Sequence, residues 1–329
     1  MTPVGSGALR PSLGLILPAT TQGELAFEAG STPSNTDASA AHLGELCRQA
    51  EAAGADSLWA TDHLFWPHPI DEPMTTLAVA TVTTSRVTLG TCVLQLPLRQ
   101  PAAVAKQAAA LQLLSGGRFV LGLGVGSHLE EYERAGVDFH RRGRLMDDGV
   151  ARLRAAWSGD PARPSEYGQE PATPRVPLWF GGSSPAARRR AAVVGDGWVP
   201  LFMTPDEYEP ALAVLRDEAA DAGRDPRNVE PGVVVFVCVG DGADTTARGM
   251  AWLSDLYRVP PKAFTRHLVS GSPAECAAGL WRYVEAGARH VIVMVAGAPS
   301  LGHFRSLRVA FDAQAERRRG AVLTGVGPA

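Results

Sequence analysis

The sequence has few of the features that mark metal sites, disulfide-rich folds or membrane anchors. Its four cysteines are widely spaced and form no C-x-x-C motif or disulfide framework. Its eight histidines form no H-E-x-x-H motif or Cys/His cluster, so we expect no metal site. No stretch approaches the roughly 18 consecutive apolar residues of a transmembrane helix, and the N-terminus does not resemble a signal peptide. We therefore expect a cytoplasmic protein that binds no membrane.

An excess of positive charge is also missing. The 31 basic and 34 acidic residues give a net charge of -3, and Lys106 and Lys262 are the only lysines. This balance predicts no nucleic-acid partner. With 45% hydrophobic residues, a chain of 329 residues can bury the core of one large barrel or of two ordinary domains. The composition favours an ordinary soluble globular protein.

Short apolar runs recur along the chain and alternate with segments of helical periodicity. Runs that are apolar throughout predict parallel strands buried on both faces, with helices as the connections. Eight such units favour an α/β fold of the (β/α)8 TIM-barrel type, and an open doubly wound sheet is the alternative. The eight predicted strands begin near Leu13, Ser57, Val87, Arg118, Val176, Gly197, Gly232 and His290.

Two connections are longer than a plain barrel requires. The segment from Ser158 to Arg175 is rich in proline and polar residues, and we expect a loop that covers the barrel mouth. Between the last two strands we expect two helices, near Thr245–Tyr257 and Pro273–Ala286, as a second insertion at the carboxyl face. We predict a flexible tail at 1–10, one domain at 11–320 and a C-terminal tail at 321–329.

The second predicted strand ends in Asp62 and His63. In such barrels the working groups lie at the carboxyl ends of the strands, and histidine exchanges protons near neutral pH. This position predicts that His63 is catalytic, although a histidine that only caps the strand is the simpler alternative. Large or polar residues near the same strand ends are the candidates for a substrate pocket. They are Phe65, Trp66, Gln95 and His128.

The stretch GLGVGS, residues 122–127, resembles a dinucleotide fingerprint but has Ser127 where that motif needs glycine. We reject that interpretation. We expect these glycines to let a flat ring approach the backbone, with a glycine-kinked strand as the alternative. The charged residues that follow, Glu130, Glu131 and Arg141–Arg144, are expected to be solvated or paired on a helical face.

The stretch WFGGSSP is the strongest local signal. Gly181, Gly182, Ser183 and Ser184 follow a strand, and Pro185 opens a helix. The free amides at that helix start predict an anion site, and an ordinary capped helix is the alternative. A nucleophile elbow is excluded because proline stands where G-x-S-x-G needs its last glycine. The arginines at 188–190 are expected on a solvated face.

Four blocks together resemble the bacterial luciferase-like superfamily, most closely its branch that uses coenzyme F420. The blocks are ADSLWATDH at 55–63, SRVTLGTCVLQLPLRQPAAVAKQAAALQLLSGGRFVLGLGVG at 85–126, EEYERAGVDFHRRGR at 130–144, and VPLWFGGSSPAARRRAAVVGDGW at 176–198. They occur in the family's order and spacing over nearly the whole chain.

The resemblance implies that F420, or alternatively FMN, lies in the barrel mouth with His63 as the rim histidine. Its phosphate would be held by residues 181–184, and the bond between Cys92 and Val93 would be a cis peptide. The positions implied to lie near the coenzyme ring are Asp62, Thr91, Cys92, Val93, Gly126 and Ser127.

The implied activity is hydride transfer between C5 of the deazaflavin and an organic substrate. We expect reduction of an activated C=C, C=N or C=O bond in a secondary metabolite. Glucose-6-phosphate oxidation is not expected, because Ser127 and His128 replace the acidic residue of the sugar-phosphate dehydrogenases. The alternatives are an FMN-dependent two-component monooxygenase and a coenzyme-binding protein without turnover. The resemblance further implies a homodimer and a separate F420 or flavin reductase.

Overall fold

Eight parallel strands form a closed barrel in the computed structural model, which describes residues 10–18, 40–158, 175–297 and 300–324. Each strand pairs with the next around the ring, and the last pairs with the first. The predicted (β/α)8 barrel and all eight predicted strands are confirmed. In ring order the strands are β1 (Ser12–Ile16), β2 (Ser57–Ala60), β3 (Thr88–Thr91), β5 (Phe119–Gly124), β6 (Leu178–Gly181), β7 (Gly197–Val199), β8 (Glu230–Val239) and β10 (His290–Val295).

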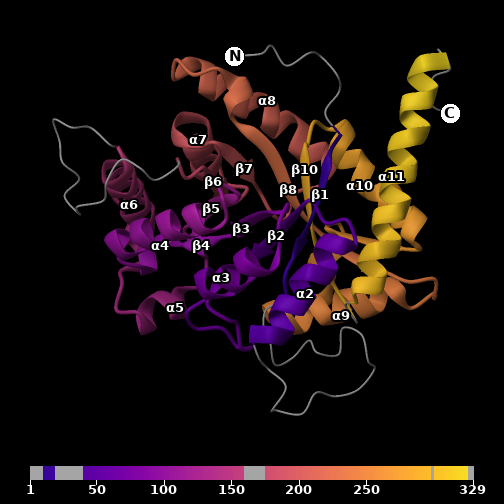
Figure 1. Ribbon diagram of the computed structural model, residues 1–329, viewed down its shortest axis with the longest axis horizontal. Helices are drawn as coiled ribbons and strands as arrows, with labels where there is room; N and C mark the ends of the chain where they lie inside the picture. The colour runs from indigo at the N-terminus through magenta and orange to yellow at the C-terminus, as the bar shows by residue number, and fades with distance from the viewer. Residues whose placement is uncertain (1–9, 19–39, 159–174, 298–299, 325–329) are drawn as a thin grey trace.

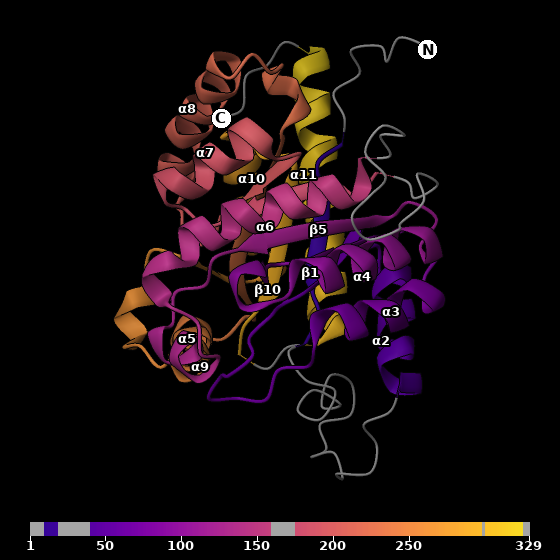
Figure 2. The same ribbon diagram turned by 90° about the vertical axis from the view of Figure 1, so that its left-hand side faces the viewer.

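Helices surround this ring, as Figures 1 and 2 show. Those that pack outside the strands are α2 (Ala40–Ala52), α3 (Pro73–Thr83), α4 (Pro101–Leu114), α6 (Arg142–Trp157), α7 (Pro185–Val194), α8 (Pro205–Asp221), α10 (Pro273–Glu285) and α11 (Leu301–Thr324). Short 3-10 turns are η1 (Leu96–Leu98), η2 (Phe139–Arg141) and η3 (Pro226–Asn228). Helix α11 continues past residue 320, so the boundary expected there falls inside it.

Two small helices lie at the carboxyl ends of the strands, α5 (Leu129–Arg134) and α9 (Thr245–Tyr257). Both occupy the lower end of the molecule in Figures 1 and 2, opposite the N-terminus. Helix α9 opens the insertion expected between the last two strands. The turn η4 (Pro261–Phe264) and strand β9 (Leu268–Gly271) follow it, and β9 adds to the far half of β8. A further two-residue strand, β4 (Leu94–Gln95), pairs with β5.

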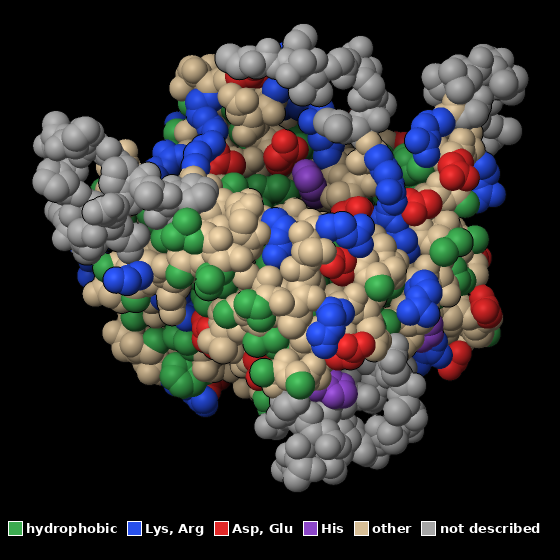
Figure 3. All heavy atoms as spheres, in the orientation of Figure 1, with side chains coloured by type: hydrophobic (Ala, Val, Ile, Leu, Met, Phe, Trp, Pro, Cys, Tyr) green, Lys and Arg blue, Asp and Glu red, His purple; other side chains and the backbone are tan. Residues whose placement is uncertain are grey.

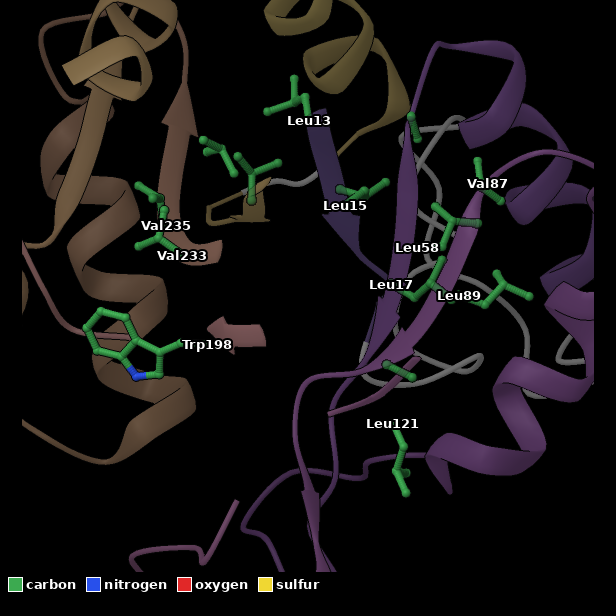
Figure 4. Packing of buried hydrophobic residues seen from close by; sticks show 14 of the residues in the cluster. Leu13, Leu15, Leu17, Leu58, Val87, Leu89, Leu121, Trp198, Val233 and Val235 are labelled. Atoms are coloured by element: carbon green, nitrogen blue, oxygen red, sulfur yellow. The ribbon is translucent and has the colours of Figure 1, made fainter. Parts of the chain in front are cut away.

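Side chains alternate along each strand between two separate cores. Leu13, Leu15 and Leu17 of the β1 segment point outward, where they join the core between strands and helices that Figure 4 shows. Ile16 belongs to a second core inside the barrel, together with Trp59 and Trp179. The period of two that defines a strand therefore divides the apolar residues between both faces of the wall.

Two tryptophans fill the barrel interior, and glycines on the neighbouring strands make room for them. The rings of Trp59 and Trp179 lie 5.3 Å apart. A Cβ atom on Gly90 would lie 2.2 Å from the Trp59 ring, and one on Gly197 would lie 2.5 Å from Trp179. Because the interior is packed in this way, the barrel is a core and not a channel.

Three helices that follow strand ends begin by the same local rule. Ser184, Thr204 and Ser272 occupy the N-cap positions of α7, α8 and α10, and a proline follows each cap. Glu207 and Glu275 complete capping boxes in the last two helices. These residues fix where the chain turns from strand ends into helices.

Parts of several predictions lie outside the described residues: most of the N-terminal tail, positions 159–174 of the expected mouth loop, and positions 325–329. None of the helices in the described ranges has the length and apolar character needed to cross a membrane. On the face that Figure 3 shows, acidic and basic side chains are interspersed. This pattern agrees with the near-balanced charge of the sequence.

We predict that Gly90→Ala destabilises the protein by about 1–3 kcal/mol, because its new methyl group must displace the packed Trp59 ring. The measurement is the midpoint of urea unfolding followed by tryptophan fluorescence. Gly302→Ala on α11 is the control, since its Cβ would meet only Ser300 Oγ at 3.4 Å. Equal midpoints for both variants would contradict this account of the barrel interior.

Candidate functional site

His63 lies three residues after the end of β2, at the carboxyl end of the barrel, and 22% of its side chain is exposed. Its ring stacks on Trp66 with 3.8 Å between centroids. Nδ1 lies 3.0 Å from Oε2 of Glu131. Among the described residues, Nε2 has no hydrogen-bond partner. One ring nitrogen is therefore held by the protein, and the other is available to a ligand.

Glu131, on α5, has a fully buried side chain and is paired with His63, so of the two expectations, solvated or paired, the structure shows the second. Its Oε1 accepts hydrogen bonds from the backbone amides of Leu64 and Phe65, at 2.5 and 3.3 Å. Gln95 Nε2 donates to the same oxygen at 3.1 Å. The chain after β2 thus folds over α5 and supplies the donors that make burial of this carboxylate tolerable.

These hydrogen bonds also decide the charge of Glu131. Burial alone raises the pKa of its carboxyl, but the hydrogen bond and the charge of His63, with the hydrogen bonds from Gln95 and the Phe65 amide, outweigh burial and hold the pKa below its usual value. Glu131 is therefore ionised at neutral pH. The site places one negative charge directly behind the imidazole.

Asp62 anchors the neighbouring segment. Its Oδ1 pairs with Arg99 Nη2 at 2.6 Å, and its Oδ2 accepts the backbone amide of Gln95 at 2.8 Å. Gln95 Nε2 in turn donates to the carbonyl oxygen of Asp62 at 3.1 Å. Both carboxylate oxygens of Asp62 are engaged, so its side chain supports Gln95 and Arg99. Arg99 was not identified from the sequence.

Two buried polar atoms beside His63 lack partners. Within the described residues, the buried side-chain atoms without a hydrogen bond are Trp66 Nε1, Gln95 Oε1 and His267 Nδ1. Gln95 Oε1 lies against Gly126, where a Cβ atom would approach it to 1.9 Å. Because buried polar groups are nearly always satisfied in a finished interior, a free donor and a free acceptor at this place indicate a ligand site.

The bond between Cys92 and Val93 is cis, as the resemblance implied. Val93 packs where Gly124 and Gly181 have no side chains, and Cβ atoms there would lie 2.3 and 2.6 Å from its methyl groups. Burial raises the pKa of the Cys92 thiol to about 12, so the thiol is neutral. These two strand-end glycines accommodate Val93. Gly124 was expected to make room for a flat ring, whereas the structure shows it making room for this side chain.

Thr91 is fully buried, and its hydroxyl donates to the carbonyl oxygen of Gly122 at 2.7 Å. Its side chain therefore stabilises the pairing of β3 with β5. Ser127, by contrast, is exposed just after β5. The side chain of Ser127 is therefore accessible to a ligand, whereas that of Thr91 is not.

The start of α7 matches the predicted anion cradle. Gly182 has φ of +99°, a conformation that favours glycine, and Ser183 and Ser184 are exposed. Ser184 Oγ accepts the amide of Ala187 at 3.2 Å and Ser184 O that of Arg188 at 3.0 Å, and Pro185 has no N–H, so the amide of Ala186 is the remaining donor of the first turn. A phosphate group fits this exposed arrangement of amides and hydroxyls.

The arginines that follow are less solvated than expected. Arg188 pairs with Glu218 at 3.2 Å and Arg190 with Asp147 at 2.6 Å, and only 17% of each arginine side chain is exposed. They hold α7 against its neighbouring helices. The prediction of a solvated face is wrong for these two residues.

Aromatic residues line the other side of the site. His128 meets Trp66 edge to face at 4.4 Å, and Tyr257 of α9 lies 6.0 Å from the same ring. Burial, followed by the nearby His63, lowers the pKa of His128. Phe65 is 42% exposed. The structure thus brings three of the four predicted pocket residues, Trp66, Gln95 and His128, next to His63, and it adds Tyr257, which the sequence did not indicate.

A cavity of about 650 Å³ opens at the opposite end of the barrel. Its wall includes first residues of several strands, among them Ser12, Ser57, Thr88, Glu230 and His290. That end of a TIM barrel contributes to stability and does not carry the reaction. In the described parts of the chain, no group of three or more His, Cys, Asp or Glu is placed to hold a metal ion.

Comparisons with known proteins identify the family of the chain. A family model described as luciferase-like monooxygenase matches residues 20–248. A phthiodiolone/phenolphthiodiolone dimycocerosates ketoreductase from Mycobacterium tuberculosis (strain ATCC 25618 / H37Rv) is 30% identical over 257 residues, which cover 66% of this chain and 67% of the relative.

Two solved structures share the fold. An F420-dependent secondary alcohol dehydrogenase in complex with an F420-acetone adduct superposes with a TM-score of 0.75 at 19% identity, covering 92% of this chain and 99% of that one. The oxygenating constituent of 3,6-diketocamphane monooxygenase from Pseudomonas putida, in complex with FMN, gives 0.66 at 16% identity, with 87% and 92% coverage. The chain is a luciferase-like oxidoreductase and belongs to the luciferase-like monooxygenase family.

Proposed function

We propose that this protein is an F420-dependent oxidoreductase that interconverts a ketone and a secondary alcohol. One observation carries the proposal: His63 has Nδ1 fixed by a buried carboxylate and Nε2 without a protein partner at the carboxyl end of the barrel. An imidazole held in this way suits the exchange of a proton with a substrate oxygen. The ketoreductase relative and the fold shared with a secondary alcohol dehydrogenase support the choice of a carbonyl substrate.

When bound, the coenzyme supplies the hydride. Residues of this chain would bind the coenzyme, orient the substrate and exclude water. Gly182, Ser183 and Ser184 would hold the phosphate at the start of α7, and the segment Cys92–Val93 would back the ring. Trp66 and Tyr257 form an apolar wall beside His63, which restricts water near the proton that the imidazole carries.

An FMN-dependent monooxygenase is the second candidate, because the fold is shared with an FMN-containing oxygenase. The two candidates differ in what they require: the monooxygenase consumes oxygen, whereas carbonyl reduction proceeds without it. A coenzyme-binding protein without turnover would bind tightly and react with no acceptor. Oxygen consumption and turnover of carbonyl acceptors therefore separate the three possibilities.

We predict that His63→Gln lowers the turnover of ketones with reduced F420 by about 10²–10⁴-fold, because glutamine cannot supply the proton. The measurement is the anaerobic oxidation rate of reduced F420 against a panel of ketones. His140→Gln is the control, since His140 is exposed on η2. Undiminished rates in His63→Gln would remove this residue from the reaction.

We predict that F420 raises the melting temperature of the native protein more than FMN does at equal concentrations. A ligand at about 100 times its Kd stabilises the folded state by about 2.7 kcal/mol.

Ser184→Asp should abolish most of this shift, because aspartate still caps the helix but repels a phosphate. Ser272→Asp makes the same change at the N-cap of α10 and should leave the shift intact. An equal shift in both variants would place the phosphate away from α7.

A further inference from the structure

We infer that Glu131 is a positioning residue that keeps a proton on Nδ1 of His63, so that Nε2 is the atom that exchanges a proton with the substrate oxygen. This inference rests on the proposed function and adds to it a residue and a defined tautomer. Neither the family match nor the relatives' names assign any role to this glutamate.

The hydrogen-bond donors around Nδ1 settle the position of the ring proton. Gln95 Nε2 carries two hydrogens, and these have acceptors at Asp62 O and Glu131 Oε1, both at 3.1 Å. Its contact with His63 Nδ1, at 3.3 Å, is therefore not needed as a hydrogen bond. Nδ1 instead faces Oε2 of Glu131 at 3.0 Å, and two lone pairs would repel each other there. Only a proton on Nδ1 makes this contact favourable.

The partner of that proton is a carboxylate and not a carboxylic acid. Oε1 of Glu131 accepts from the amides of Leu64 and Phe65 and from Gln95. Backbone amides can only donate, so the surroundings favour the form of Glu131 that only accepts. Glu131 therefore accepts a hydrogen bond from Nδ1–H and has no proton to donate to the ring.

Both members of the pair are held in place. The stacked Trp66 ring restricts rotation of the imidazole. Gln95 is held at its backbone amide and at its side chain by Asp62, which is itself paired with Arg99. The loop after β2, the short strand β4 and helix α5 thus converge on one carboxylate. This agreement of three separate segments is expected of a site built to fix geometry.

The chemical consequence is the same in both directions of the reaction. In reduction, the bound coenzyme would supply a hydride to the carbonyl carbon and would itself be oxidised, the C=O π pair would move to oxygen, and the Nε2 proton of the imidazolium would be transferred to that oxygen. His63 would then be neutral and keep its Nδ1 proton, which stays hydrogen-bonded to Glu131. In oxidation, neutral Nε2 would accept the hydroxyl proton, the oxidised coenzyme would take up the hydride from the carbinol carbon, and Glu131 would offset the positive charge that develops on the ring.

The first test needs no coenzyme. Long-range ¹H–¹⁵N spectra of the uniformly labelled protein, recorded over a pH series that reaches the neutral ring, report which nitrogen of each histidine carries the proton. The His63 signals are those missing from His63→Gln. We expect a protonated Nδ1 and an unprotonated Nε2. Protonation at Nε2 in the unaltered protein would overturn the inference, whatever any variant does.

The second test replaces the carboxylate. In Glu131→Gln an amide can donate to Nδ1, so we expect the tautomer to reverse; an amide in the corresponding place of a serine protease has this effect. We expect kcat for the ketone to fall by about 10- to 1000-fold, with KM and the F420-induced melting shift changed by less than about threefold. A purely structural role would instead change binding and stability together.

Glu130→Gln is the matched control, because Glu130 is the next residue on α5 but is 74% exposed and pairs with Arg134. It should keep both the tautomer and kcat. Retention of the Nδ1 proton and of full kcat in Glu131→Gln would overturn the inference. If the variant does not fold, the spectrum of the unaltered protein decides. If the tautomer is as expected but no carbonyl compound reacts, the proposed function fails and the positioning of His63 by Glu131 stands.

Discussion

The buried carboxylate of Glu131 is the constraint on which the arrangement of the site depends. A fully buried carboxylate needs several hydrogen-bond donors. Here the donors are backbone amides of the loop after β2, the side chain of Gln95 on β4 and the imidazole of His63. These donors come from two segments, the loop after β2 and strand β4, and the carboxylate comes from a third, α5. Satisfying one charge therefore fixes the relative positions of β2, β4 and α5 at the mouth.

The barrel interior determines which part of the molecule is left for a ligand. Trp59 and Trp179 fill the space between the strands, and this is possible because the adjacent strands have glycines, which lack side chains, at the facing positions. Glycines have the same role at the mouth, where Gly124 and Gly181 make room for the side chain of Val93. Ligand atoms are therefore confined to the loops beyond the strand ends, where Gly182 and Ser183 remain exposed.

The strands and most helix starts were predictable because their causes are local: apolar alternation, a serine or threonine cap, and a following proline. Helix α3 was missed because its residues, PMTTLAVATVT, are largely β-branched, and burial of one face overrides their low helix propensity. Glu131 was missed for a different reason. Adjacent glutamates look alike in sequence, and only the loop from β2, more than sixty residues away, buries one and leaves its neighbour exposed.

Two histidines at opposite ends of the barrel differ in how many of their ring nitrogens have a hydrogen-bond partner, and this difference distinguishes a structural imidazole from one that can react. At the N-terminal end, His290 contacts Ser12 Oγ through Nδ1 at 2.9 Å and Glu230 through Nε2 at 3.3 Å. Both of its nitrogens are engaged, and it lies at a face that serves stability. His63 has a glutamate on one nitrogen and no partner on the other within the described residues. Both rings are paired with carboxylates, so pairing alone does not distinguish them; the nitrogen that the protein leaves free does.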